Sequence, residues 1–198
     1  MPSANTVALD SHADASLRYI RRSMEAATSL AIPGSAGIAM GIVGCIATVL
    51  SLVPELRNYW LSIWLVAAVF ASGVGGLLVL RPASVRALAL SGTPIRKFAL
   101  CLLPSLFAGA VLTAVLGAHD SLQAVPAVWL LLYGCALMSA SVPTTRTIGV
   151  MGASFIALGL IALLIPDEFQ MLALGIGFGG LHIAFGCWIA RGRHGSES

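Results

Sequence analysis

The sequence predicts an all-α membrane protein: a bundle of six transmembrane helices built as three hairpins and preceded by an amphipathic N-terminal helix. Three observations favour this fold class. Of the 198 residues, 58% are hydrophobic and only 10% are charged, whereas soluble domains carry about 25% charged residues. The apolar segments reach the roughly 17–25 residues that a helix needs to cross a bilayer. The basic residues gather on one side of the predicted spans.

The six predicted spans are separated by short polar segments rich in turn residues. They cover residues 33–53, 60–80, 98–116, 125–142, 147–165 and 171–190. The first and fifth spans share a weak internal repeat, because residues 37–54 and 149–166 both start at a glycine and end at a proline that precedes an acidic residue. This repeat favours an arrangement as three hairpins, in which residues 33–190 form one transmembrane domain.

Residues 1–32 form an N-terminal tail that is predicted to contain the amphipathic helix. Ser11 to Asp14 match a capping box, in which a serine and an acidic residue three positions later close the start of a helix. Apolar residues follow at helical spacing, with arginines elsewhere around the helix. A basic amphipathic helix is typical of a membrane surface, and the alternative is a soluble helix that packs on the cytoplasmic loops. Residues 191–198 form a polar tail.

The charge distribution predicts the orientation of the bundle. An even number of spans places both termini on one side, and ten of the eleven basic residues fall on that side; Arg57 is the exception. The ten are Arg18, Arg21, Arg22, Arg81, Arg86, Arg96, Lys97, Arg146, Arg191 and Arg193. Because basic loops stay in the cytoplasm, we expect a bacterial inner-membrane protein with both termini cytoplasmic. The same asymmetry accounts for the net charge of +3 without a nucleic-acid partner.

The last span contains the candidate functional site. His182 is the ionisable side chain that lies deep inside an apolar span, and Gly175, Gly179 and Gly186 share its predicted helix face. Small residues mark the side where another backbone approaches in lipid, so we expect His182 to point into the bundle. A bulky stripe on the same helix is expected to face lipid: Leu174, Phe178, Leu181, Phe185 and Trp188.

Two roles for His182 follow from its position. An ionisable residue inside a membrane is a functional candidate, as an acid sensor for example, whereas the structural alternative is a neutral imidazole bonded to a hydroxyl or carbonyl on the next helix. Span one offers the best matched surface for the glycine face, through Gly41, Gly44 and Thr48. We favour the structural role, because the predicted spans contain no carboxylate to pair with His182.

No other pattern in the sequence points to catalysis or to a cofactor. There is no nucleophile elbow, no His-Glu-x-x-His motif and no ligand spacing typical of a metal site. His182 together with a methionine, or with a second copy of His182, would make a weak haem site. The four cysteines, Cys45, Cys101, Cys135 and Cys187, are read as small buried packing residues. We therefore expect no enzyme, no metal and no cofactor.

The last hairpin contains a pattern of glycine and proline in an apolar background: Gly149-Val150-Met151-Gly152, residues 157–166, Leu174-Gly175 and Phe185-Gly186. With these residues it resembles the repeated hairpin of the HdeD family of six-span bacterial inner-membrane proteins. That resemblance implies a link to acid resistance without a defined molecular activity. Residues 17–25 together with 179–186 are also similar to other bacterial six-span inner-membrane proteins, a resemblance that implies the membrane but no chemistry.

Two functions remain open on this sequence. The first is a non-enzymatic accessory, regulatory or stress-related membrane protein that acts through the lipid bilayer, a membrane partner or its own oligomerisation. The second is a small transporter or pore for a neutral or weakly polar solute, lined by hydroxyl-bearing residues and His182; the hydroxyls are those of Thr48, Ser51, Ser72 and Thr113. A polar cavity that reaches His182 would favour the transporter, and a filled bundle would favour the accessory protein.

Overall fold

The computed structural model describes residues 32–81, 93–142 and 144–194. Within these residues the chain is helical and contains no strand, which confirms the all-α class. The long elements are α2 (Gly34–Leu52), α3 (Trp60–Leu80), α5 (Thr93–Ala118), α6 (Val125–Ala140) and α7 (Arg146–Ala162). The last stretch is continuous but changes type, from α8 (Gln170–Leu174) through the π-helical η4 (Gly175–Leu181) to α9 (His182–His194).

Five of these helical segments are long and apolar enough to cross a membrane. They begin or end close to the predicted spans, and α3 matches its predicted span at both ends. The α7 helix has 17 residues and is shorter than predicted, because the chain turns after Ala162 before it reaches Pro166. The predicted amphipathic helix and the connection at residues 82–92 lie outside the described residues.

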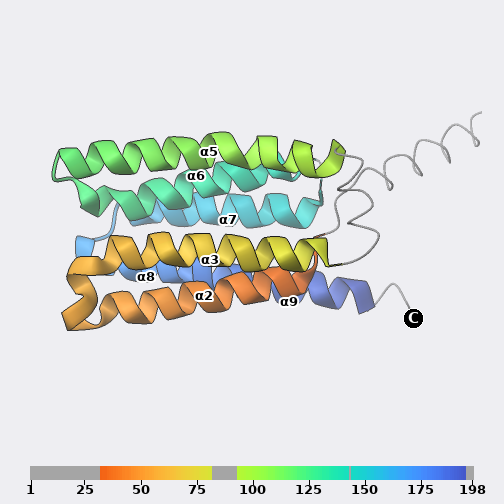
Figure 1. Cartoon of the computed structure of the whole chain (residues 1–198), viewed down its shortest axis with the longest axis horizontal. Helices are drawn as coiled ribbons and strands as arrows, with labels where there is room; N and C mark the ends of the chain where they lie inside the picture. The colour runs from red at the N-terminus through yellow and green to blue at the C-terminus, as the bar shows by residue number, and fades with distance from the viewer. Residues whose placement is uncertain (1–31, 82–92, 143, 195–198) are drawn as a thin grey trace, which may run out of the picture.

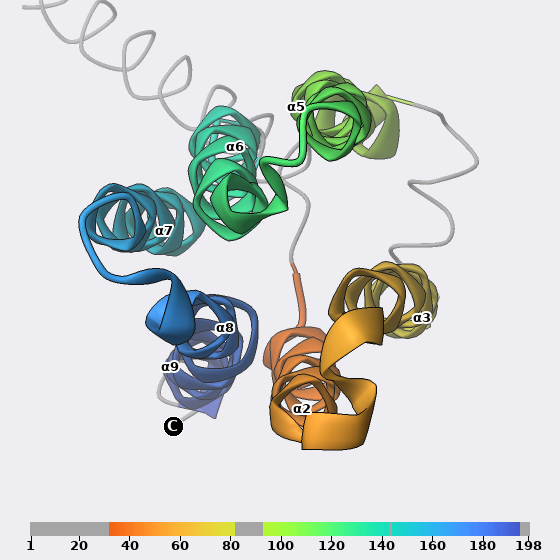
Figure 2. The same ribbon diagram turned by 90° about the vertical axis from the view of Figure 1, so that its left-hand side faces the viewer.

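The helices lie side by side along one axis and form a ring in cross-section (Figures 1 and 2). The order around the ring is α3, α2, the α8–η4–α9 stretch, α7, α6 and α5, with packed neighbours at each step from α3 to α5. The helices α3 and α5 are not a packed pair, so the ring is open between them (Figure 2). The last helix packs more extensively on α2 than on α7, which differs from the close hairpin expected between the fifth and sixth spans.

The described connections at one end of the bundle are of one kind. Short 3₁₀ helices form three connections at the left-hand end of Figure 1: η1 (Pro54–Tyr59), η2 (Leu122–Ala124) and η3 (Asp167–Phe169). Prolines begin or precede η1 and η3, where their missing N–H groups leave no helical hydrogen bond unmade. This end carries Glu55, Arg57, Asp120, Asp167 and Glu168, and we call it the acidic end.

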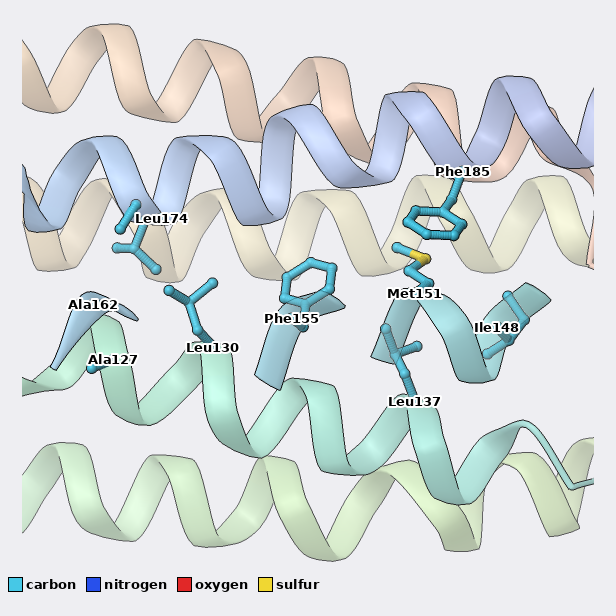
Figure 3. Close-up of a cluster of buried hydrophobic side chains, with 10 residues drawn as sticks. Ala127, Leu130, Leu137, Ile148, Met151, Phe155, Ala162, Leu174 and Phe185 are labelled. Atoms are coloured by element: carbon cyan, nitrogen blue, oxygen red, sulfur yellow. The ribbon is translucent and has the colours of Figure 1, made fainter. Parts of the chain in front are cut away.

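The core lies between α6, α7 and the last helical stretch. Leu130 and Leu137 of α6, Met151 and Phe155 of α7, and Leu174 and Phe185 point toward one another there (Figure 3). Small residues bring α6 and α7 together, since a Cβ on Gly134 would lie 2.8 Å from the carbonyl oxygen of Gly152. Close packing of this kind, rather than the hydrophobic effect, holds helices together in lipid.

Candidate functional site

The glycine face of the last helix lies against α2. A Cβ added to Gly179 would lie 2.7 Å from the Cys45 sulfur, and one added to Gly175 would lie 2.6 Å from the Thr48 hydroxyl. In return, a Cβ on Gly44 would lie 2.5 Å from the carbonyl oxygen of Phe178. Gly41 and Gly186 are equally enclosed, the first by Gly179 and Ile183 and the second by Gly34 and Ile38. The structure thus brings together the six small residues that the sequence singled out around His182.

His182 itself does not face α2. Its side chain is 3% exposed and its Nε2 lies 2.9 Å from the hydroxyl oxygen of Tyr133 on α6, a hydrogen bond in which the tautomer decides the donor. The predicted hydroxyl partner therefore exists, but on a different helix from the one expected. The glycines face α2 while the imidazole points to the other side, because this helix sits between two neighbours and buries two faces.

The bulky stripe of the last helix was expected to face lipid, and this prediction is wrong for most of its members. Leu174 and Phe185 are buried in the core, and Phe178 and Leu181 are partly buried against it. Only Trp188, at 58% exposed, lies on the outside as predicted. The error has the same cause: the prediction gave the helix one buried face and assigned the opposite face to lipid.

Aromatic rings enclose His182. The Phe178 ring stacks on the imidazole at 6.0 Å and the Phe155 ring meets it edge-on at 5.4 Å. Tyr133 lies 5.0 Å from each of these two phenylalanine rings. The carbonyls of Gly177 and Phe178 lie near the imidazole, but Nδ1 has no hydrogen bond of good geometry with any described residue. His182 is therefore hydrogen-bonded through Nε2 and enclosed by aromatic rings.

Tyr133 carried one signal that the sequence analysis overlooked. It lies eight residues into α6, about 12 Å from the start of the helix, which is too deep for the aromatic belt at a membrane surface. A tyrosine at that depth needs an internal partner for its hydroxyl, and the histidine was available. Phe155 carried no such signal, because a phenylalanine in an apolar span suits lipid and core alike.

The π-helical segment η4 was not predicted either. In a π-helix the backbone bonds reach five residues instead of four, and η4 contains Gly175, Gly177, Gly179 and Gly180. Glycines leave room for the wider turn and for the approach of α2 on one side. On the other side Gly177 lies against Leu130 and Phe155. The segment thus places Phe178 and His182 among the aromatic rings of α6 and α7.

An apolar cavity of about 150 Å³ lies beside this aromatic cluster. Its walls come from α2, α3, α5, α6 and the last helical stretch, on the side where the ring is open (Figure 2). Trp60, Trp64, Trp129, Tyr133 and Phe178 supply its aromatic lining. The cavity ends at Tyr133 and Phe178, which stand between it and His182. We call it the inner cavity.

One polar atom beside the inner cavity has no partner. The Trp64 indole Nε1–H is enclosed and has no acceptor in the described part of the protein, whereas the Trp129 Nε1–H donates to the Thr113 hydroxyl at 3.0 Å. An enclosed donor without an acceptor costs about 1–3 kcal/mol. A bound molecule with an oxygen acceptor could offset that cost after a small turn of the indole.

A second cavity, of about 330 Å³, lies at the acidic end of the bundle and is called the outer cavity. Arg57, Asp167 and Glu168 line it together with Ser51 and Gln170. Gln170 is 5% exposed; its side-chain nitrogen donates to the Ala162 carbonyl at 2.6 Å, while its Oε1 has no partner. The Ser51 hydroxyl donates to the Ala47 carbonyl at 2.8 Å and can still accept.

The hydroxyls proposed as a pore lining do not converge. Thr48 and Thr113 each donate to a carbonyl one turn back on their own helix. Ser51 lines the outer cavity and Ser72 lines the inner cavity. No described cavity joins them to His182, so the structure does not assemble the predicted path.

The cysteines and the possible metal ligands are spread over the bundle. All four cysteines are free, but Cys45 and Cys135 are exposed on the bundle surface rather than buried as predicted. Among the described residues, no group of three histidine, cysteine, aspartate or glutamate side chains could hold a metal ion. The geometry offers two cavities, one with mostly apolar and aromatic walls and one with polar walls.

The long apolar helices and this interior define a multi-pass membrane protein. No family model, curated protein or solved structure matches the chain, so its likeness to the HdeD family stays a prediction.

Proposed function

We propose that this chain is a six-span protein of the bacterial inner membrane, with both termini in the cytoplasm, that acts without enzymatic chemistry as an accessory or regulatory protein by binding lipid inside its bundle. Besides the five long apolar segments, α7 is counted as a span, because its 17 residues meet the lower limit for crossing a bilayer. The basic residues Arg81, Arg96, Lys97, Arg146 and Arg191 lie opposite the acidic end, which supports the orientation by the positive-inside rule.

The observation that carries the lipid-binding proposal is the inner cavity. It lies at the level of the apolar helices, its lining is almost wholly aromatic and aliphatic, and it stops short of His182. An apolar cavity inside a bundle suits an acyl chain, because contacts with the cavity walls replace the contacts that the acyl chain makes with other lipids in the bilayer. A polar solute would find few partners there, such as the Trp64 indole and the Ser72 hydroxyl.

Tryptophan fluorescence can test the binding of a chain. Three of the four tryptophans line the inner cavity, while Trp188 lies outside it. In detergent, a few equivalents of a phospholipid with brominated acyl chains should quench the Trp188→Phe variant strongly. A variant that keeps Trp188 alone, with Trp60, Trp64 and Trp129 changed to Phe, should be quenched weakly.

A cavity-filling pair of variants supplies the control. Ala68 lines the inner cavity, whereas its neighbour Val69 is 75% exposed on the outside of α3. Ala68→Phe should abolish the quenching and Val69→Phe should leave it unchanged. Equal quenching of both variants would contradict binding in the inner cavity.

The topology has its own test. A reporter enzyme that works only outside the cytoplasm, fused after Ser198, should be silent. The same reporter inserted after Asp120, in the turn at the acidic end, should be active. The reverse pattern would overturn the orientation.

The outer cavity favours a second candidate function, a transporter for a small neutral solute. Its buried Ser51 and Gln170 side chains could receive such a solute from one side of the membrane. The candidate requires a route past the Tyr133–His182 pair, so it predicts that proteoliposomes take up glycerol-sized solutes and that Tyr133→Ala accelerates uptake. Uptake equal to that of protein-free liposomes would exclude it.

A further inference from the structure

The two cavities follow one another along the bundle axis. Trp60, the first residue of α3, lines both of them. On α8, Met171 lines the outer cavity, and Leu174, about one turn further from the acidic end, lines the inner cavity. The outer cavity therefore lies next to the inner cavity along the bundle axis, nearer the acidic end. Together the two cavities place polar walls before apolar walls, as a phospholipid places its headgroup before its acyl chains.

The charges of the outer cavity fit a zwitterion. Its lining carries one guanidinium, from Arg57, and two carboxylates, from Asp167 and Glu168. Within the described residues no ion pair shorter than 4.0 Å joins Arg57 to either carboxylate, so both signs of charge are available to a ligand. A guanidinium is the preferred partner of a phosphate, and carboxylates accept charge-assisted hydrogen bonds from an ammonium group.

The buried side chains of the outer cavity favour a ligand that carries a hydrogen-bond donor. Gln170 is enclosed, and its Oε1 accepts no hydrogen bond from the described protein. The Ser51 hydroxyl beside it donates to its own helix and has acceptor capacity left. Both groups can accept from a primary ammonium, which has three N–H donors, whereas a trimethylated ammonium of the same charge has none.

The depth of the site matches the depth of a phospholipid. Trp60 stands at the start of α3, where interfacial tryptophans are found. Trp64 lies about 6 Å deeper and Ser72 about 18 Å deeper along the same helix, and both line the inner cavity. A molecule with its headgroup at Arg57 would therefore run its acyl chain into the hydrocarbon layer along this wall.

We infer that the two cavities form one binding site for a diacyl phospholipid whose headgroup joins a phosphate to a primary ammonium, as in phosphatidylethanolamine. Arg57 binds the phosphate, while Asp167, Glu168 and, after a rotation of its enclosed side chain, the Gln170 Oε1 accept from the ammonium, and one acyl chain occupies the inner cavity. This assignment rests on the proposed function and adds to it the headgroup that is selected and the side of the bundle on which it is held.

Lipid competition on the full chain in detergent tests the headgroup. Unbrominated phosphatidylethanolamine, phosphatidylcholine and phosphatidylglycerol with identical chains each compete against the brominated phospholipid in the quenching assay on Trp188→Phe. We expect phosphatidylethanolamine to compete at concentrations about tenfold lower than either of the others, the gain that a few charge-assisted hydrogen bonds provide.

Variants of the outer cavity supply the matched controls. The double variant Asp167→Asn, Glu168→Gln should lose the preference for phosphatidylethanolamine and still bind chains. Asp120→Asn removes a carboxylate from the same end of the bundle but outside the cavity, and it should keep the full preference.

The outcomes separate this inference from the proposed function. Quenching with equal competition by all three lipids, or with a preference for phosphatidylglycerol, would overturn the headgroup assignment and leave chain binding intact. A preference that survives in the double variant would overturn the roles of Asp167 and Glu168. Absence of quenching by any brominated lipid would overturn both proposals.

Discussion

Two parts of the bundle are packed in different ways. We compare the fraction of buried residues in the apolar stretch of each spanning segment. This fraction is 6% in α3 and in α5, against 33% in α2 and 39% in both α6 and the last helical stretch. The tight part, which comprises α2, α6 and the last helical stretch, is held by glycines that face a backbone, as Gly44 does against Phe178. The loose part, which comprises α3 and α5, borders the inner cavity. The comparison suggests that the tight part is the scaffold and that α3 and α5 are walls that can yield to a ligand.

Glycine shows the difference most clearly. In α3, Gly73 and Gly76 have no atom within 4 Å of a would-be Cβ, and only Gly75 is enclosed, by the Met40 side chain. Ala68, Ser72 and Gly76 recur every four residues along α3, a spacing that predicts a close-packing face. The first two instead line the inner cavity, and the third meets no neighbour. A small residue in an apolar helix can therefore mark a close contact, a cavity wall or an empty surface.

The largest effect is expected from glycine substitutions that compare the two parts. Gly44→Leu should destabilise the protein by about 3 kcal/mol, because its Cβ would overlap the backbone of the last helix. Gly76→Leu, on the open surface of α3, should be neutral or stabilise by up to about 1 kcal/mol, since glycine is a poor helix former. Unfolding of both variants in detergent with increasing denaturant measures the difference.

A second pair repeats the comparison within one helix. Gly179 faces Cys45 of α2, whereas its neighbour Gly180 has nothing within 4 Å. Gly179→Leu should be as damaging as Gly44→Leu and Gly180→Leu should be tolerated. If the two neighbours were equally sensitive, the assignment of the glycine face to α2 would be wrong.

A smaller effect is expected at the hydrogen bond between α6 and the last helix. His182→Leu leaves the Tyr133 hydroxyl without its partner among aromatic rings, which should cost about 1–3 kcal/mol. His182→Gln keeps a polar partner and should cost less. Thermal unfolding in detergent gives both values.

The double variant Tyr133→Phe, His182→Leu checks the mechanism. Removing both partners should cost less than the sum of the single changes, with a coupling of about 0.6–2 kcal/mol, as found for hydrogen bonds in membranes. Strict additivity would show that the hydrogen bond contributes nothing and that His182 acts through packing alone.

The sequence predicted the helices well and their neighbours poorly, for a physical reason. Length, hydropathy and turn residues are local, so the ends of α3 and the burial of His182 could be read directly. Which neighbouring helix packs against a given face depends on the order of the helices around the ring. Gly179 and His182 lie close together on the helix surface, yet one meets α2 and the other α6. The two cavities arise from that same order and left no pattern in the sequence.

The smallest effect is expected at the contact between α5, in the loose part, and α6, in the tight part. The Thr113 hydroxyl of α5 accepts from the Trp129 indole of α6 at 3.0 Å, and a Cβ on Gly109 would lie 3.2 Å from the same ring. Thr113→Val keeps the shape of the side chain but removes the acceptor, so it should cost about 1 kcal/mol. Thr113→Ser keeps the hydroxyl and should stay close to wild type. Because Trp129 also lines the inner cavity, Thr113→Val should alter quenching by brominated lipid as well. A loss of stability with unchanged quenching would mean that α5 is fastened to the bundle independently of the cavity.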